Sequence, residues 1–107
     1  MTNPADLLAL ATRLAREAGA LLLDRLPADR TDVTSKSSPT DVTSDADRAA
    51  EALIVGTLRR ERPDDAVLAE EGTADTGSTG LRWVVDPLDG TVNYLYRAAA
   101  FGVSIAV

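Results

Sequence analysis

The sequence contains no cysteine and no histidine among its 107 residues. Without cysteine there is neither a disulfide framework nor a thiolate metal site, which is compatible with a reducing cytoplasm. Without histidine, Ser-His-Asp hydrolysis, phosphohistidine chemistry and the usual zinc sites are excluded. Any chemistry must therefore use carboxylates, hydroxyls, lysine and backbone groups, and a metal partner would be a hard cation with oxygen ligands, such as Mg²⁺.

Positive charge is in the minority. The chain has 11 basic and 17 acidic residues, a net charge of -6, which opposes binding to nucleic acid or to anionic membranes. Any bound phosphate would depend on a metal ion for positive charge. Long apolar runs are also missing: no window approaches the length of a membrane span, and the first residues show no leader pattern. We therefore expect a cytoplasmic protein, and 107 residues with 45% apolar content suffice for one modest domain.

Two amphipathic helices are predicted from apolar periodicity. Apolar residues recur at three- and four-residue spacing from position 4 to about 26, with charges between them. A second periodic stretch begins at or near Asp45 and is closed by Pro63. Ser44 is expected to cap this second helix, which places Asp47 in its first turn.

The remaining segments read as loops and strands. Residues 28–44 are rich in Ser, Thr and Asp and predict a loop with short extended pieces, with a β-hairpin as an alternative. Short apolar runs over 66–72, 81–86 and 99–107 predict strands. A Gly/Ser/Thr connector over 72–80 joins the first two of these strands.

Carboxylates gather at the predicted ends of these elements. Glu70 and Glu71 end one strand, Asp86 ends the next, and Asp89 follows after a tight turn. If the two strands are neighbours in one sheet, Glu70 and Asp86 emerge at the same edge, where like charges repel unless a cation is present. Mg²⁺ binds such carboxylates together with backbone carbonyls and water. We therefore expect a magnesium site there, with Asp47 as a further acid.

The turn after these acids suits a phosphate. Gly90 allows close approach of the backbone to a ligand, and Thr91 adds a hydroxyl. A short helix starting within 90–96 would direct free N–H groups and a positive dipole end toward a phosphate. Together these features predict metal-assisted phosphoester hydrolysis, in which metals lower the pKa of a bound water and stabilise the leaving oxygen.

The stretch DPLDGTVNY at 86–94, with AEEG before it and KSSPTDVTSDAD before that, resembles the inositol monophosphatase family of Mg²⁺-dependent, lithium-sensitive sugar phosphatases. The match follows the family's order over nearly the whole chain. The resemblance implies an α+β protein with the layered αβαβα fold, of which residues 1–107 are a single N-terminal portion: two helices packed on the start of an antiparallel sheet. The C-terminal half, with a further metal-binding aspartate and most substrate contacts, is expected to be absent.

Carried over residue by residue, the resemblance implies oxygen ligands for two or three Mg²⁺ ions. These ligands are Glu70, Asp86, the backbone carbonyl of Leu88, and Asp89. The substrate phosphate would be bound by the backbone N–H groups of Gly90 and Thr91, beside Asp89.

The resemblance also implies the catalytic groups. The Thr91 hydroxyl and Glu70 would orient the attacking water, and Asp47 would assist that water and an outer metal. Lys36 would lie on a loop near the site, and Glu71 would support the ligands. The implied reaction is hydrolysis of inositol monophosphate, or of a related small polyol or sugar phosphate, by direct water attack, in a possible homodimer.

Several of these residues also have plain structural explanations. Asp47 would stabilise the first turn of a helix capped by Ser44 by up to about 1 kcal/mol. The glutamate pair would be a solvated strand end, and Lys36 a surface lysine. Asp86 and Asp89, separated by Pro-Leu and followed by Gly, are harder to explain by a turn alone.

Other functions remain as alternatives. A haloacid-dehalogenase-like phosphatase also ends an apolar strand in Asp-Gly-Thr. Its two aspartates, however, are separated by one residue, whereas Pro87 and Leu88 separate the two here, and the glutamate pair has no role in that mechanism. Histidinol phosphate, fructose bisphosphate and adenosine bisphosphate phosphatases share the metal motif. A different class of function is a truncated, non-catalytic module for metal binding or protein interaction, which would show no Mg²⁺-dependent stabilisation if it had lost the site.

Overall fold

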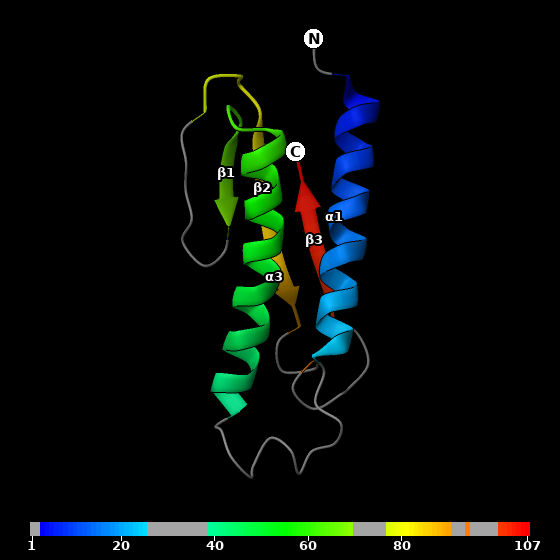
Figure 1. Cartoon of the computed structure of the whole chain (residues 1–107), viewed down its shortest axis with the longest axis vertical. Coiled ribbons are helices and arrows are strands. Elements are labelled where there is room, and N and C mark those ends of the chain that lie inside the picture. Colours follow the sequence, from blue (N-terminus) through cyan, green and yellow to red (C-terminus); the bar gives the residue numbers. More distant parts are fainter. Residues whose placement is uncertain (1–2, 26–38, 70–76, 91–93, 95–100) are drawn as a thin grey trace.

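The computed structural model describes residues 3–25, 39–69, 77–90, 94 and 101–107, with only the backbone described over 39–44. The elements are α1 (Pro4–Asp24), α3 (Pro39–Glu61), β1 (Ala66–Ala69), β2 (Arg82–Asp89) and β3 (Gly102–Ala106). Figure 1 shows both helices on the same side of the sheet, with α3 over β2 and α1 over β3. None of the described helices is both long and apolar enough to cross a lipid bilayer.

Helix α1 forms where the sequence predicted it and ends at Asp24, just short of the expected position 26. Its first turn is capped by Asn3, whose side chain accepts a 2.9 Å hydrogen bond from the N–H of Ala5. Pro4 then occupies the first turn, where its missing N–H costs nothing. The buried stripe consists of Leu14, Ala18 and Leu22.

Helix α3 begins at Pro39, so the predicted start near Asp45 with Ser44 as the cap is wrong. A proline suits the first turn of a helix because that turn needs no N–H from it. The Thr, Asp and Ser residues that follow have weak preferences, which packing of the apolar stripe overrides. The end of the predicted 28–44 loop is therefore helical, and its remainder, with the hairpin alternative, lies outside the described residues.

The sheet has the order β1-β2-β3 and is mixed. β3 pairs antiparallel to β2, as expected, but β1 pairs parallel to β2, with Ala69 opposite Val85. The expected antiparallel sheet is corrected on this point. Both strands start at the same end of the sheet, where the N–H of Ala66 donates to the carbonyl of Leu81 at 2.9 Å.

The buried carboxylate of Asp65 joins the starts of β1 and β2. Asp65 accepts two hydrogen bonds from the Arg62 guanidinium at 2.7 and 3.1 Å, one from the Thr79 hydroxyl at 2.6 Å and one from the Trp83 indole at 2.9 Å. Burial acts to raise the pKa of Asp65, but the hydrogen bonds from these three donors outweigh it and leave the pKa below its usual value. These hydrogen bonds hold β1 and β2 in one register, which decides which residues lie side by side at the other end of the two strands.

The apolar core lies between the helices and one face of the sheet. Along β2, Trp83 and Val85 are buried against the helices, whereas Val84 between them is 46% exposed on the opposite face. Leu68 of β1 is 40% exposed on the same open face. The remaining members of the core are Leu14, Ala18, Leu22, Ala46, Ala50, Ile54, Val55, Leu58, Val67, Ala69, Leu88 and Tyr94.

Candidate active site

The two aspartates of the motif both belong to β2. The sequence predicted that the strand would end at Asp86 and that Asp89 would follow a tight turn, but β2 continues to Asp89. The turn starts one residue later at Gly90, which has a φ of +84°. Only glycine adopts this left-handed conformation without strain, which is the physical reason for Gly at this position.

A β-bulge lies between the two aspartates. Asp86 pairs with Ser104 and Asp89 pairs with Gly102, so β2 advances three residues while β3 advances two. In a regular strand, residues three apart face opposite sides of the sheet. The extra residue reverses the phase, and the register places Asp86 and Asp89 on the same, open face.

The two residues between the aspartates show the bulge directly. Pro87 and Leu88 are consecutive and both buried, which regular alternation does not allow. Proline tolerates a bulge because it has no N–H to contribute to the ladder. The N–H of Leu88 donates to Oδ1 of Asp86 at 3.3 Å, a local turn typical of aspartate. The Leu88 side chain joins the core, with 2% exposure, and so holds the bulge in place.

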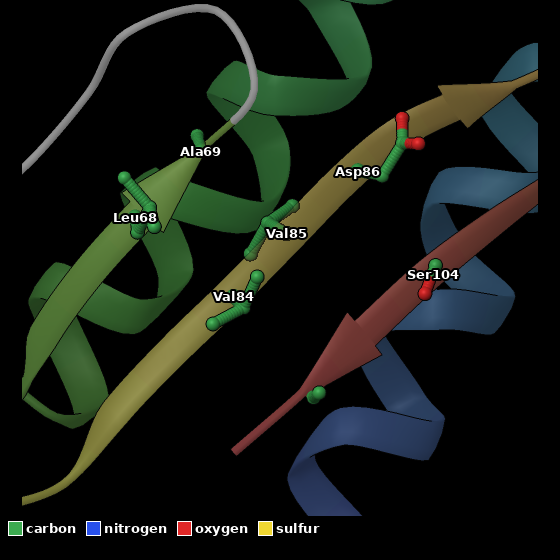
Figure 2. Close-up of a pocket in the computed structure, with 7 residues that line it drawn as sticks. Leu68, Ala69, Val84, Val85, Asp86 and Ser104 are labelled. Atoms are coloured by element: carbon green, nitrogen blue, oxygen red, sulfur yellow. The ribbon is translucent and has the colours of Figure 1, made fainter.

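Asp86 lies at the rim of a depression on the open face of the sheet (Figure 2). The depression has a volume of about 410 Å³ and is lined by seven residues from the three strands. Its apolar floor comes mainly from Leu68, Val84 and Ala106, and its polar side chains are Asp86 and Ser104. Asp86 is half-buried and Asp89 is exposed, so both carboxylates are accessible to solvent and to a ligand.

The parallel pairing of β1 and β2 bears on the expected meeting of the acids. Ala69, the last residue of β1, is opposite Val85, which directly precedes Asp86. The described part of β1 therefore runs toward the same edge of the sheet as Asp86. Four predicted site residues lie outside the described residues: Lys36, Glu70, Glu71 and Thr91.

Between Gly90 and Phe101, Tyr94 is the one residue that the structure describes. Tyr94 is helical, and its N–H donates to the Gly90 carbonyl at 2.9 Å. The Tyr94 side chain is fully buried, its hydroxyl donates to the carbonyl of Leu22 at 2.8 Å, and burial raises its pKa. Its ring also meets Phe101 edge to face, with centroids 4.9 Å apart. The last residue of the motif thus anchors the turn to α1.

Asp47 lies in the interior of α3 and is half-buried, so its explanation as a first-turn acid is wrong. One turn later in α3 is Glu51, whose Oε1 is buried with no hydrogen-bond partner in the described part of the chain. Sequence reasoning missed Glu51, although its four-residue spacing from Asp47 places both on one helix face. Among the described residues, no three acids form a group that holds a metal ion.

The donor set nevertheless fits a hard cation. Asp86 and Asp89 present carboxylate oxygens on one face, and within the described segments the Asp86 carboxylate makes no hydrogen bond besides that from Leu88. Mg²⁺ prefers oxygen ligands and keeps several waters, so it needs few protein groups at such an edge.

Comparison with known proteins identifies the family of this chain. The model of the inositol monophosphatase family matches residues 3–107. The chain belongs to the inositol monophosphatase family. Two helices on a small sheet match the N-terminal part of this family's fold, as the sequence predicted, although the sheet is mixed and not antiparallel.

Relatives of this family member carry different names. It is 37% identical over 102 residues to the Nus factor SuhB of Escherichia coli strain K12, covering 94% of this chain and 38% of that protein. It is 45% identical over 108 residues to the histidinol-phosphatase of Streptomyces coelicolor, covering 100% of this chain and 40% of that protein. The chain thus spans less than half the length of these relatives.

Solved structures agree with the sequence relatives. The inositol monophosphatase from Anabaena (Nostoc) sp. PCC 7120 superposes with a TM-score of 0.73 at 36% identity, covering 97% of this chain and 35% of that one. The extragenic suppressor protein SuhB from Bartonella henselae gives a TM-score of 0.78 at 33% identity, covering 94% and 38%. Both identities are high enough to support shared ancestry as well as a shared fold.

Proposed function

We propose that this chain forms the metal- and phosphate-binding part of a Mg²⁺-dependent phosphomonoesterase acting on inositol monophosphate or a related small polyol or sugar phosphate. The observation that carries the proposal is the bulge between Asp86 and Asp89, which turns two carboxylates onto one open face immediately before the Gly90 turn. The names of relatives support a phosphatase, since they include a histidinol-phosphatase and an inositol monophosphatase.

In this proposal the oxygen ligands are Asp86, Asp89, Glu70 and the carbonyl of Leu88. The metal, when bound, supplies positive charge for the phosphate and lowers the pKa of the attacking water. Asp86 and Asp89 supply negative charge on one face, and burial of the Leu88 side chain keeps the backbone between them in one conformation.

The turn after Asp89 would bind the substrate phosphate. Gly90 has no side chain to block the approach of an oxygen anion, and its N–H and that of Thr91 would donate to it. The Thr91 hydroxyl and Glu70 would orient the attacking water, with Asp47 assisting from α3. The cytoplasmic location and the homodimer stay predictions from the sequence.

The test is phosphate release from inositol 1-phosphate by the purified chain, with and without Mg²⁺, with the Asp89→Asn variant beside it. Histidinol phosphate is the second substrate, because it distinguishes the two activities named among the relatives. We expect release that requires Mg²⁺ and is lost in the variant. Folded protein that releases no phosphate from either substrate, or releases it equally without Mg²⁺, would contradict the proposal for this chain.

A non-catalytic interaction module is the second candidate, and one observation favours it. The open face of the sheet carries an apolar row across the three strands, with Leu68 and Val84 substantially exposed and Ala106 beside them. A surface of this kind suits packing against another polypeptide. Mg²⁺ binding separates the candidates, because a module that had lost the site would show no Mg²⁺-dependent rise in its melting temperature.

A further inference from the structure

Ser104 of β3 lies directly opposite Asp86 of β2 in the antiparallel register. Paired residues of an antiparallel sheet project from the same face, so the Ser104 hydroxyl and the Asp86 carboxylate share the open face. Both residues line the depression described above, and Figure 2 shows them on adjacent strands at its polar end.

Ser104 is chemically distinct within this depression. Of the seven lining residues, it is the only one whose side chain can donate a hydrogen bond; the others are Leu68, Ala69, Val84, Val85, Asp86 and Ala106. Its side chain is exposed, and its hydroxyl makes no hydrogen bond within the part of the chain that the structure describes. The hydroxyl therefore contributes little to the packing of the fold.

A carboxylate that binds a metal through one oxygen is oriented by donors to the other oxygen. The described donor to Asp86 is the Leu88 N–H at 3.3 Å, which is longer than a typical N–H···O bond of roughly 2.9–3.0 Å. The Cβ atoms of directly opposed residues lie about 4.5–5.5 Å apart, within reach of a hydrogen bond between their side chains or through one water. Ser104 is thus placed to complete the support of this carboxylate.

We propose that Ser104 is a positioning residue for the metal site. Its hydroxyl donates, directly or through one water, to the Asp86 carboxylate and holds it in the orientation that binds Mg²⁺. This inference rests on the proposed function, because it assigns Ser104 to the metal site proposed there.

The test is isothermal titration of the purified chain with MgCl₂ alone, without substrate. The matched pair is Ser104→Thr, which keeps the hydroxyl, and Ser104→Val, which has nearly the same shape without it; both are β-branched and suit a strand. We expect the Val variant to bind Mg²⁺ about 10–100-fold more weakly and the Thr variant to bind within a few-fold of wild type. Ser78→Ala, at an exposed loop position, is the control for loss of a serine hydroxyl elsewhere.

The outcomes separate the two proposals. Melting temperatures without metal should agree among the variants, since the side chain at position 104 is exposed. Thr and Val have nearly equal bulk, so a comparison of these two variants tests that expectation. If wild type binds Mg²⁺ and the Val variant binds it equally well, the role of Ser104 is overturned while the metal site stands. If neither wild type nor any variant binds Mg²⁺, the proposed function is overturned, and the role of Ser104 with it.

Discussion

The hydroxyl of Tyr94 donates a 2.8 Å hydrogen bond to the carbonyl of Leu22, which joins the last residue of the DPLDGTVNY motif to the last turn of α1. Carbonyls in the last turn of a helix have no partner within the helix and need one from elsewhere. The bond therefore satisfies a helix end and, at the same time, fixes the turn that begins at Gly90.

Replacing Tyr94 with Phe keeps the ring and its edge-to-face contact with Phe101 but removes this bond. The Leu22 carbonyl is then buried without its donor, and we expect the free energy of unfolding to fall by about 1–3 kcal/mol. Urea denaturation measures the change. Phe101→Leu removes the ring contact but keeps the Tyr94 hydroxyl. It should lower the free energy of unfolding by less than removal of the whole Phe101 side chain would, because leucine still packs in part of the same space. A Tyr94→Phe variant as stable as wild type would show that the bond contributes nothing.

Mg²⁺ should stabilise the folded chain through Asp89. With a free concentration about 100 times Kd, a ligand that binds only the folded state adds about 2.7 kcal/mol to the free energy of unfolding. We expect this gain in wild type and its loss in Asp89→Asn, measured by urea denaturation with and without MgCl₂. Asp64→Asn removes one acid from an exposed position before the start of β1, at the opposite end of the strand from Asp86. This variant should keep the Mg²⁺-dependent gain in the free energy of unfolding. Equal gains in all three proteins would refute a specific site at Asp89.

The bulge makes a sharper prediction about residue count. Inserting one alanine between Val103 and Ser104 removes the bulge, because β3 then advances three residues where β2 advances three. Regular alternation after Asp86 would then turn Asp89 toward the helices, so Mg²⁺-dependent stabilisation should be lost. Pro87→Ala keeps the number of residues between the aspartates and should keep the metal effect, although loss of a buried ring lowers stability without metal. The comparison is made by thermal denaturation with and without Mg²⁺. An insertion variant that folds and still responds to Mg²⁺ would show that the bulge is not required.

Asp65 predicts a loss of stability in acid. Its pKa is lowered in the folded state, so its contribution is complete above the unfolded value of about 3.9 and is lost as the pH falls through the folded pKa. The free energy of unfolding, measured in urea between pH 7 and pH 2.5, should therefore drop at the acid end. Asp65→Asn should be less stable at pH 7 by about 1–3 kcal/mol, because the charge-assisted hydrogen bonds from the partly exposed Arg62 are weakened. It should also lose less stability in acid than wild type, and a parallel decline would contradict the assignment.

Gly77 and Gly19 should respond in opposite directions to alanine. A Cβ on Gly77 would lie 2.4 Å from the backbone N of Ala66 and from the carbonyl O of Asp64, so the strand start must shift to admit it. A Cβ on Gly19, inside α1, meets nothing within 4 Å. We expect Gly77→Ala to lower the melting temperature and Gly19→Ala to raise the free energy of unfolding by about 0.5–1 kcal/mol. Equal effects would mean that the tight approach at Gly77 is absent in solution.

Local sequence patterns predict most of the helices and strands of the fold. The periodic leucines and alanines of α1, with Asn3 and Pro4 at its start, predict the helix because each acts within a few residues of itself. The apolar runs of β1, β2 and β3 predict strands for the same reason. The start of α3 was missed, because Thr and Ser after Pro39 resemble a loop unless the packing of the rest of the helix is known.

The site was predicted only as far as the motif reaches. Asp86, Asp89 and Gly90 follow from their order in the chain and from the family resemblance. Glu51 and Ser104 were missed, because neither is marked in the sequence. Glu51 is distinguished only by burial of its carboxylate oxygen, and Ser104 only by the strand opposite it.

The sequence by itself determined the family, the order of helices and strands, and the types of side chain available for chemistry. Tertiary structure alone decided that β1 runs parallel to β2, that a bulge turns Asp89 to the face of Asp86, and that Ser104 stands beside them. The physical reason is that propensity and periodicity act over a few residues, whereas strand direction and register depend on contacts such as those of Asp65 with Thr79 and Trp83, which join positions distant in the chain.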